Sequence, residues 1–146
     1  MRHFTLHAIG VIHTPFASPS EVPIQAARSE AAGRVEVFPE YGPGLRDLDG
    51  FSQIILVYWF HRAGDVSLAV RPFLDDQSHG LFATRYPARP NPIGLSVVEL
   101  VRVDGCMLHV CAVDVLDGTP LLDIKPFVPA FDHRPGARVG WLTGRV

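Results

Sequence analysis

The chain has 146 residues, of which 47% are hydrophobic and 19% charged, and its formal net charge is −2. This composition excludes a disordered chain, and the length fits one domain with one core. The net charge excludes a globally basic nucleic-acid binder, and the lack of a signal peptide or of a run near the roughly 18 apolar residues of a membrane span predicts a soluble, cytoplasmic protein.

Short strands are the expected elements, because thirteen glycines and thirteen prolines leave little room for long helices. Ile54–Phe60 is a continuous apolar and aromatic run, typical of a central strand covered on both faces. Alternating runs between Leu95 and Val115 flank Asp104-Gly105, the preferred pair for a two-residue type I′ turn, and predict a hairpin. Further strands are expected at Leu6–Ile12, Val35–Phe38, Leu81–Ala83, Leu122–Ile124 and Arg138–Leu142. Together these strands indicate a barrel or a sandwich.

Helical signals are few. Ile24–Ala32 has a helix-forming composition, and one helical turn is expected at Gly44–Leu48. Cys106 and Cys111 are expected on opposite faces of one strand, where they cannot form a disulfide with each other. Neither they nor the histidines have the spacing of a metal site, so no metal is expected. The sequence also contains no glycine-rich phosphate loop and no nucleophile elbow.

Two polar strings stand at the ends of apolar strands. In the first, residues 59–62 (WFHR), the histidine either caps an exposed strand end or contacts a ligand. The second, residues 82–96, reads FATRYPARPNPIGLS, and its prolines hold Arg85, Arg89 and Asn91 on a stiff backbone. Stiffly held guanidinium groups suit a carboxylate or a phosphate. The alternative is a surface loop with solvated arginines.

A third polar string, residues 114–129, reads DVLDGTPLLDIKPFVP. Asp117 and Gly118 belong to a turn by composition. Asp123 and Lys125 lie two positions apart, and therefore on the same face of an extended strand. These opposite charges either pair with each other or form part of a wall around a polar, cationic ligand.

Taken in order, the strings IGVIHTPF, GFSQIILVYWFH, GLFATRYPARPNPIGLSVVEL and DVLDGTPLLDIKPFVP resemble the blocks of the TrmO-like (YaeB-like or TsaA-like) family, from about Ile9 to Phe131. The resemblance implies a mainly β, non-Rossmann fold: a short-stranded β-barrel with few short helices. It implies a homodimeric methyltransferase that depends on S-adenosylmethionine (SAM) and methylates N6 of N6-threonylcarbamoyladenosine at position 37, in the anticodon loop of tRNA. We expect a single domain over residues 1–146 without a C-terminal extension domain.

The same resemblance assigns residues to the two ligands. The residues implied to bind SAM are Pro23, Ile24, Gln25, His61, Arg62, Arg85, Leu95, Leu116, Asp117 and Gly118. The family's more basic Pro-Arg-Gln form is replaced by Pro-Ile-Gln in this chain. Arg89, Asn91 and Lys125 are then expected on the substrate side. A urea-like N6 is a poor nucleophile, so a base would assist attack, and Asp117, Asp123 or His61 is the expected base.

Two other functions stay open at this stage. One is SAM-dependent methylation of a small molecule or of another RNA, and the other is a SAM-binding protein without catalysis. With a net charge of −2, tRNA binding would require a cluster of cations. The expected members of this cluster are Arg62, Arg71, Arg85, Arg89 and Lys125.

Overall fold

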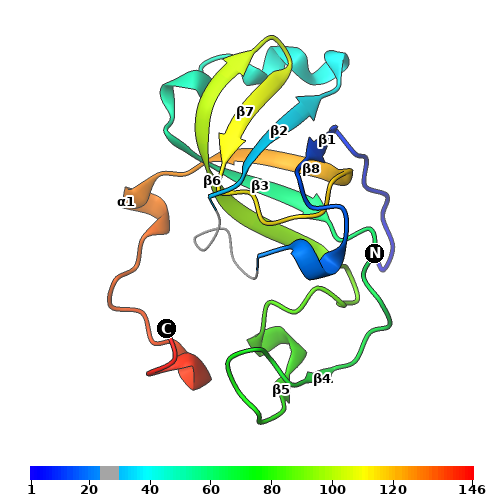
Figure 1. Ribbon diagram of the computed structural model, residues 1–146, viewed down its shortest axis with the longest axis vertical. Coiled ribbons are helices and arrows are strands. Elements are labelled where there is room, and N and C mark those ends of the chain that lie inside the picture. The colour runs from blue at the N-terminus through cyan, green and yellow to red at the C-terminus, as the bar shows by residue number, and fades with distance from the viewer. Residues whose placement is uncertain (24–29) are drawn as a thin grey trace.

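Six strands close into a barrel in the computed structural model, which describes residues 1–23 and 30–146 (Figure 1). Their order around the barrel is β1-β2-β7-β6-β3-β8, and every neighbouring pair with a given register is antiparallel. The barrel strands are β1 (Gly10–His13), β2 (Ala32–Val37), β3 (Gln53–Trp59), β6 (Ile93–Asp104), β7 (Met107–Cys111) and β8 (Thr119–Pro126). The expectation of a mainly β, short-stranded barrel is confirmed.

The remaining described elements are short. They are the strands β4 (Ala69–Val70) and β5 (His79–Gly80), the 3₁₀ helices η1 (Pro19–Glu21), η3 (Pro39–Leu45), η4 (Leu48–Gly50), η5 (Leu81–Ala83) and η6 (Gly140–Leu142), and the α-helix α1 (Pro129–Asp132). Three of them begin with proline, whose fixed φ suits the first helical position and whose missing N–H has no intrahelical partner there. The scarcity of long helices follows from the density of proline and glycine.

The core fills the barrel because the strands alternate inward and outward residues. In β3, Ile54, Leu56 and Tyr58 are at most 3% exposed, while the residues between them are half-buried. The expected strand forms, and it pairs with β6 on one side and β8 on the other. In a closed barrel every strand has two neighbours, so β3 is not a central strand, and only its inward face is fully covered. The buried core residues are Ile12, Val35, Val37, Ile54, Leu56, Tyr58, Val98, Leu100, Leu108, Val110, Val113, Val115 and Leu121.

The predicted hairpin forms, but its turn lies one residue later than expected. Asp104 pairs with Met107, so the two loop residues are Gly105 and Cys106 rather than Asp104 and Gly105. Gly105 has a φ of 61° and Cys106 has no positive φ, which is the pattern of a type II′ turn. Cys106 therefore lies in the turn, and the two cysteines do not share a strand. β7 ends at Cys111, well before the predicted Val115.

Two of the predicted strands are wrong. Leu81–Ala83 is the 3₁₀ helix η5, and Arg138–Leu142 contains the 3₁₀ helix η6, with Gly140 at a φ of 56°. A short apolar run becomes a strand only where a neighbouring strand offers a ladder of backbone partners, and neither segment pairs with a strand in the described chain. The N–H of Leu81 donates one backbone hydrogen bond, to the carbonyl of Leu68 next to β4. The first strand is shorter than expected, because residues 1–8 are exposed and pairing starts near Gly10.

The helical expectations have mixed outcomes. Most of Ile24–Ala32 falls on residues 24–29, which lie outside the described residues, and Ala32 begins β2 rather than ending a helix. The single turn expected at Gly44–Leu48 is divided between the end of η3 and the start of η4. Asp47, between these two 3₁₀ helices, has a φ of 71°.

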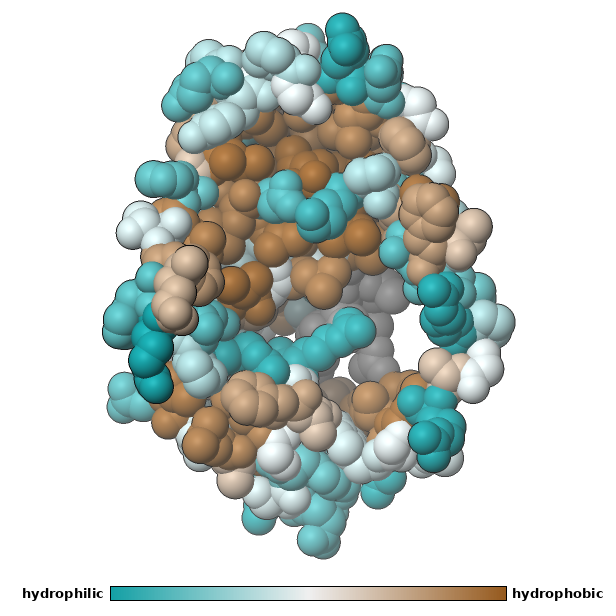
Figure 2. All heavy atoms as spheres, turned by 180° about the vertical axis from the view of Figure 1, so that it is seen from behind, coloured by the Kyte–Doolittle hydropathy of each residue, from teal (hydrophilic) through white to brown (hydrophobic). Residues whose placement is uncertain are grey.

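A long connection between β3 and β6, residues 60–92, leaves the barrel and carries β4, β5 and η5. We call it the β3–β6 connection. In Figure 1 it lies below the barrel, and the C-terminal tail, drawn in red, ends beside it. Seen from the opposite side, apolar side chains gather over the barrel and hydrophilic ones surround them (Figure 2).

Candidate functional site

Asp117 and Gly118 form a turn between β7 and β8, which we call the Asp117 turn. This turn contacts the end of β1. One carboxylate oxygen of Asp117 accepts a hydrogen bond from the backbone N–H of Thr14 at 3.0 Å and lies 3.7 Å from Nδ1 of His13. The next residue, Gly118, has a φ of 83°, which explains why glycine stands there. An open depression of about 350 Å³ lies at this corner. It is lined by His13, Thr14, Pro15, Ala32, Arg34 and Asp117.

Asp123 and Lys125 lie on the same side of β8, as expected, and pair with each other. The Lys125 ammonium is 2.8 Å from Oδ2 of Asp123, and Oδ1 accepts a hydrogen bond from the backbone N–H of Ile124 at 2.9 Å. The hydrogen bond that Lys125 donates to Asp123, together with the charge of Asp123, raises the pKa of Lys125. Of the two alternatives left open by the sequence, the structure has the ion pair.

His61 and Arg62 leave the end of β3 and are exposed. The backbone N–H of Phe60 donates a hydrogen bond to the carbonyl of Pro92 at 2.7 Å. The first polar string thus meets the proline-rich string, although Phe60 and Pro92 are 32 positions apart in the sequence.

The proline-rich string holds its arginines in different ways. Arg85 is exposed. Nη1 of Arg89 donates hydrogen bonds to the carbonyls of Thr84 at 2.9 Å and Tyr86 at 3.0 Å, and its guanidinium lies 5.8 Å from the centre of the Phe82 ring. Arg89 therefore fastens its own loop, which differs from the expectation that its guanidinium is presented outward.

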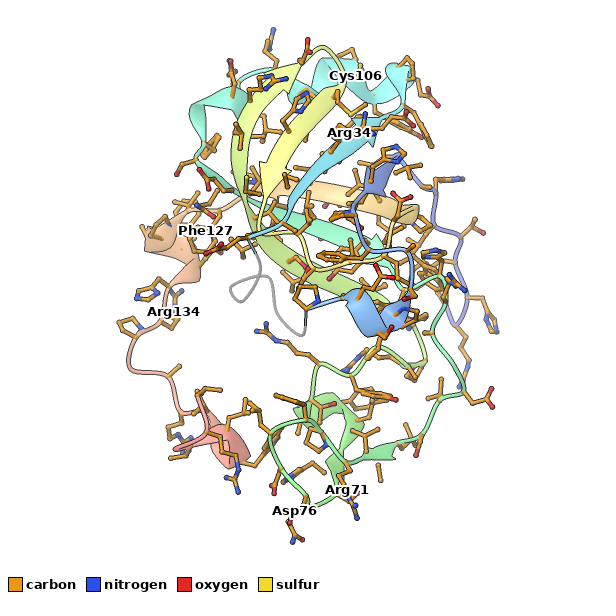
Figure 3. All side chains as sticks on the ribbon, in the orientation of Figure 1. Arg34, Arg71, Asp76, Cys106, Phe127 and Arg134 are labelled. Carbon is orange, nitrogen blue, oxygen red and sulfur yellow. The ribbon has the colours of Figure 1, made fainter. Side chains whose placement is uncertain are left out.

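The expected cluster of five cations does not form as a unit. Lys125 is paired on β8 and Arg89 is bound to its own loop. Arg71 and Asp76 lie at the far end of the β3–β6 connection, away from the barrel (Figure 3). A shared phosphate-binding surface made of all five is therefore wrong for this chain.

A series of hydrogen-bonded polar side chains, which the sequence did not predict, lies in the barrel end that faces the β3–β6 connection. The Tyr58 hydroxyl is 2.7 Å from Oγ of Ser96, and Ser96 donates to Asp114 at 2.6 Å. Tyr58 and Ser96 are 3% and 4% exposed. Burial and then the charge of Asp114 raise the pKa of Tyr58, while the Ser96 hydrogen bond and the charge of Arg85 act in the opposite direction. The available signal was a polar residue at inward positions of both strands.

The other residues that were expected to bind SAM lie on different faces of the molecule. Leu95 is 57% exposed on the outside of β6, where it pairs with Val57, and Val57 pairs on its other side with Asp123. Leu116 is half-buried beside the Asp117 turn, and Pro23 is half-buried near η1. Ile24 and Gln25 lie outside the described residues. The exposed Asn91 lies next to Pro92 on the proline-rich string.

The described part of the chain contains no candidate metal site and no candidate membrane-spanning helix. There, no group of three or more His, Cys, Asp or Glu side chains is arranged to hold a metal ion. Among the same residues, no helix has the length and apolar character needed to cross a membrane.

The sequence segments that form these sites match a known protein family. Residues 11–133 match the model of the tRNA-methyltransferase O N-terminal domain. The chain belongs to the TrmO family. A solved TrmO structure is 38% identical, with a TM-score of 0.82 over 96% of this chain and 64% of that chain. A second TrmO structure, from Pseudomonas aeruginosa, is 37% identical with a TM-score of 0.80.

Two relatives of this chain have names that differ in the activity they state. A probable S-adenosyl-L-methionine-binding protein of Pyrococcus abyssi is 58% identical over 94% of this chain and 76% of its own length. The tRNA (adenine(37)-N6)-methyltransferase of Escherichia coli is 35% identical over 97% of this chain and 65% of its own length. This chain therefore spans just under two thirds of the E. coli enzyme and of the solved TrmO chains.

Proposed function

We propose that the protein is a SAM-dependent methyltransferase that methylates N6 of N6-threonylcarbamoyladenosine at position 37 of tRNA, as a homodimer. The observation that carries the proposal is the convergence of polar groups at one barrel end. Tyr58, Ser96 and Asp114 form a hydrogen-bonded chain there, and the charge of Arg85 acts on Tyr58. Membership of the TrmO family and the names of its relatives support the same chemistry.

The side chains present suit the chemical groups of SAM. Its carboxylate needs a guanidinium, which Arg85 offers from the exposed side of the proline-rich string. Its sulfonium favours nearby carboxylates, and Asp114 and Asp117 lie on the segment that leads from β7 to β8. Its adenosine needs an apolar slot with backbone hydrogen bonds, for which Leu116 and Gly118 are the proposed neighbours. His61, Arg62, Leu95 and residues 23–25 complete the proposed site by family resemblance.

SAM supplies an activated methyl group for a single in-line displacement. The residues of this chain align the acceptor nitrogen with that methyl group and exclude water. The acceptor N6 becomes a better nucleophile when its proton is removed during attack. Of the three proposed bases, Asp123 has both oxygens engaged, one by Lys125 and one by a backbone N–H. Asp117 and His61 are therefore the bases we favour.

Substrate contacts are proposed for Asn91, Arg89 and Lys125, which lie four to seven positions along the chain from the nearest proposed SAM residue. A base in a single-stranded loop can be turned out of its stack and placed on an aromatic ring. Tyr86, which is 48% exposed beside Arg85, offers such a ring. This arrangement suits an anticodon-loop adenosine better than a base inside a duplex.

A second candidate function is SAM binding without methyl transfer. It is favoured by the Pyrococcus abyssi relative, which is 58% identical and is named for SAM binding alone. In that case the pocket would be complete, and methyl transfer to tRNA or to a small molecule would be absent.

Isothermal titration with SAM separates these functions, using wild type, Arg85→Ala and Arg71→Ala. Arg71 is the matched control, because it is an exposed arginine of the same connection that lies far from the barrel. We expect wild type and Arg71→Ala to bind equally and Arg85→Ala to bind at least about tenfold more weakly, since a hydrogen-bonded ion pair is lost. Absence of binding by folded wild type would overturn the proposed function.

Methyl transfer is then measured with labelled SAM and tRNA that carries threonylcarbamoyladenosine, against the same tRNA without this modification. Transfer only to the modified tRNA supports the proposed reaction. Binding of SAM without transfer to either RNA supports the second candidate function.

A further inference from the structure

The C-terminal tail, residues 139–146, holds the segment from which Arg85 projects. The indole N–H of Trp141 donates a hydrogen bond to the carbonyl of Ala83 at 2.8 Å, across 58 positions of sequence. Ala83 is the last residue of η5 and lies two positions before Arg85. Figure 1 shows the tail reaching the β3–β6 connection after it leaves the barrel through α1.

Trp141 is itself held in place by contacts that involve three other residues. It stacks on the imidazole of His79, with ring centres 4.5 Å apart and planes inclined by 17°. Nε2 of His79 is 2.7 Å from Oδ2 of Asp75, whose Oδ1 is 3.7 Å from Nη2 of Arg145. Arg145 closes the ring of contacts by donating from Nη1 to the carbonyl of Trp141 at 2.7 Å. We call these four residues the tail clasp.

Hydrogen bonds within the β3–β6 connection fix η5 relative to the rest of that connection, but not relative to the remainder of the protein. Leu81, which is 1% exposed, donates from its N–H to the carbonyl of Leu68 at 2.9 Å. Thr84 bonds back to the carbonyl of Leu81 through both its N–H and its hydroxyl. The bond from Trp141 adds a restraint from the other end of the chain. A side chain held in its binding geometry before the ligand arrives loses less entropy on binding.

We propose that Trp141 is a positioning residue for the SAM site: by fixing Ala83, it fixes where the guanidinium of Arg85 stands. This inference rests on the proposed function, in which Arg85 binds the carboxylate of SAM. Trp141 and Arg145 lie outside residues 11–133, the part matched by the family model. The role therefore belongs to a segment that the family comparison leaves without assignment.

The test replaces the N–H donor and keeps an aromatic ring. Trp141→Phe can still stack on His79, but it cannot bond to Ala83. We expect its dissociation constant for SAM, measured by isothermal titration, to rise about three- to tenfold, the range that one lost hydrogen bond gives. The backbone amides of Thr84 and Arg85 should exchange with deuterium faster in this variant, because their segment opens more often.

Two further variants make the test specific. Phe131→Ala removes a 71% exposed aromatic residue of the C-terminal segment outside the clasp, and its SAM affinity should equal that of wild type. His79→Ala removes the stacking and keeps the indole donor, so we expect a smaller loss than in Trp141→Phe. This variant also keeps the test sharp if Trp141→Phe does not fold.

Each outcome decides between the two proposals. Weaker SAM binding with faster exchange at Thr84 and Arg85 supports the positioning role. Faster exchange with wild-type SAM affinity overturns it, because the tail then orders the loop without serving the ligand. Failure of folded wild type to bind SAM overturns the proposed function and, with it, the positioning role.

Discussion

The buried hydroxyl of Tyr58 needs a hydrogen-bond partner, and Ser96 supplies it while donating to Asp114. The position of a residue in this hydrogen-bonded series decides how many hydrogen bonds are lost when its side chain is removed. Removing the end of the chain deletes one bond, whereas removing the middle deletes two and leaves a buried phenol without its partner.

We therefore expect Ser96→Ala to destabilise the protein more than Tyr58→Phe does. A net loss of about 1 kcal/mol is expected for Tyr58→Phe and about 1 to 3 kcal/mol for Ser96→Ala. Urea unfolding of both variants measures the difference. Equal losses would mean that the phenol of Tyr58 finds another partner when Ser96 is removed.

Gly94 is a second residue whose role follows from its neighbours. A Cβ at this position would collide with the rings of Tyr58 and Phe60, which pack edge to face with centres 5.3 Å apart. The glycine of the NPIGLS string is thus needed for close packing and not for an unusual φ.

Gly94→Ala should destabilise the protein by about 1 to 3 kcal/mol, because rigid rings must move to admit the methyl group. Thermal unfolding measures the effect, and Gly64→Ala is the matched control, since nothing lies within 4 Å of a Cβ built there. A Gly94→Ala variant as stable as the control would contradict the packing argument.

At the scale of elements, the sequence was informative wherever a pattern repeats within one segment. The period-2 alternation of β6 and β7 and the continuous apolar run of β3 indicate strands without knowledge of any partner. Leu81–Ala83 and Arg138–Leu142 are too short for such a pattern, so a partner strand had to decide their structure. The Tyr58-Ser96-Asp114 chain could not be predicted, because only the folded barrel brings together residues that are 38 and 18 positions apart.

The site assignments came from family blocks rather than from spacing. Asp117 could be placed in a turn by its neighbour Gly118, but its bond to Thr14 depends on β1 ending beside that turn. Arg89 reads as a presented cation in the sequence, whereas the fold of its loop brings two carbonyls within its reach. Sequence spacing alone cannot distinguish an arginine that is presented to a ligand from one that bonds to its own loop.

The tail clasp should respond to acid through Asp75, whose side chain is only 6% exposed. Hydrogen bonds from His79 and Gln77, with the charge of Arg145, lower the pKa of Asp75 from 3.8 to about 2. Because the pKa is lower in the folded protein, the stabilisation is complete above about pH 4 and disappears as the pH falls through about 2.

The difference in unfolding free energy between wild type and Asp75→Asn should therefore shrink as the pH is lowered from about 4 to 2. Urea unfolding at several pH values measures this difference. A difference that stays constant over this interval would show that the charge of Asp75 does not hold the tail.

At the scale of the whole molecule, the outer surface of the barrel is apolar where β3 and β6 pair. Ile55 pairs with Val97 and Val57 pairs with the exposed Leu95. Figure 2 shows apolar side chains on one face of the barrel, with a group of hydrophilic side chains among them. Exposed apolar area of this kind is typical of a surface that contacts another protein.

We expect sedimentation of wild type to give the mass of a dimer and that of Val97→Glu to give a monomer, because a charge would be buried in the proposed contact. Glu99→Gln, on the same strand, is the control and should leave the dimer intact. A wild-type monomer at micromolar concentration would contradict the homodimer.

The barrel is closed by β1, a strand of four residues that pairs with β2 on one side and with β8 on the other. Residues before Ile9 are exposed, so an affinity tag at the N-terminus should leave the fold intact. Truncation past His13 would instead expose the edges of β2 and β8 together. Such a shortened chain would have two bare strand edges, which could pair with the bare edges of another shortened copy, so that pairing within one molecule becomes association between molecules.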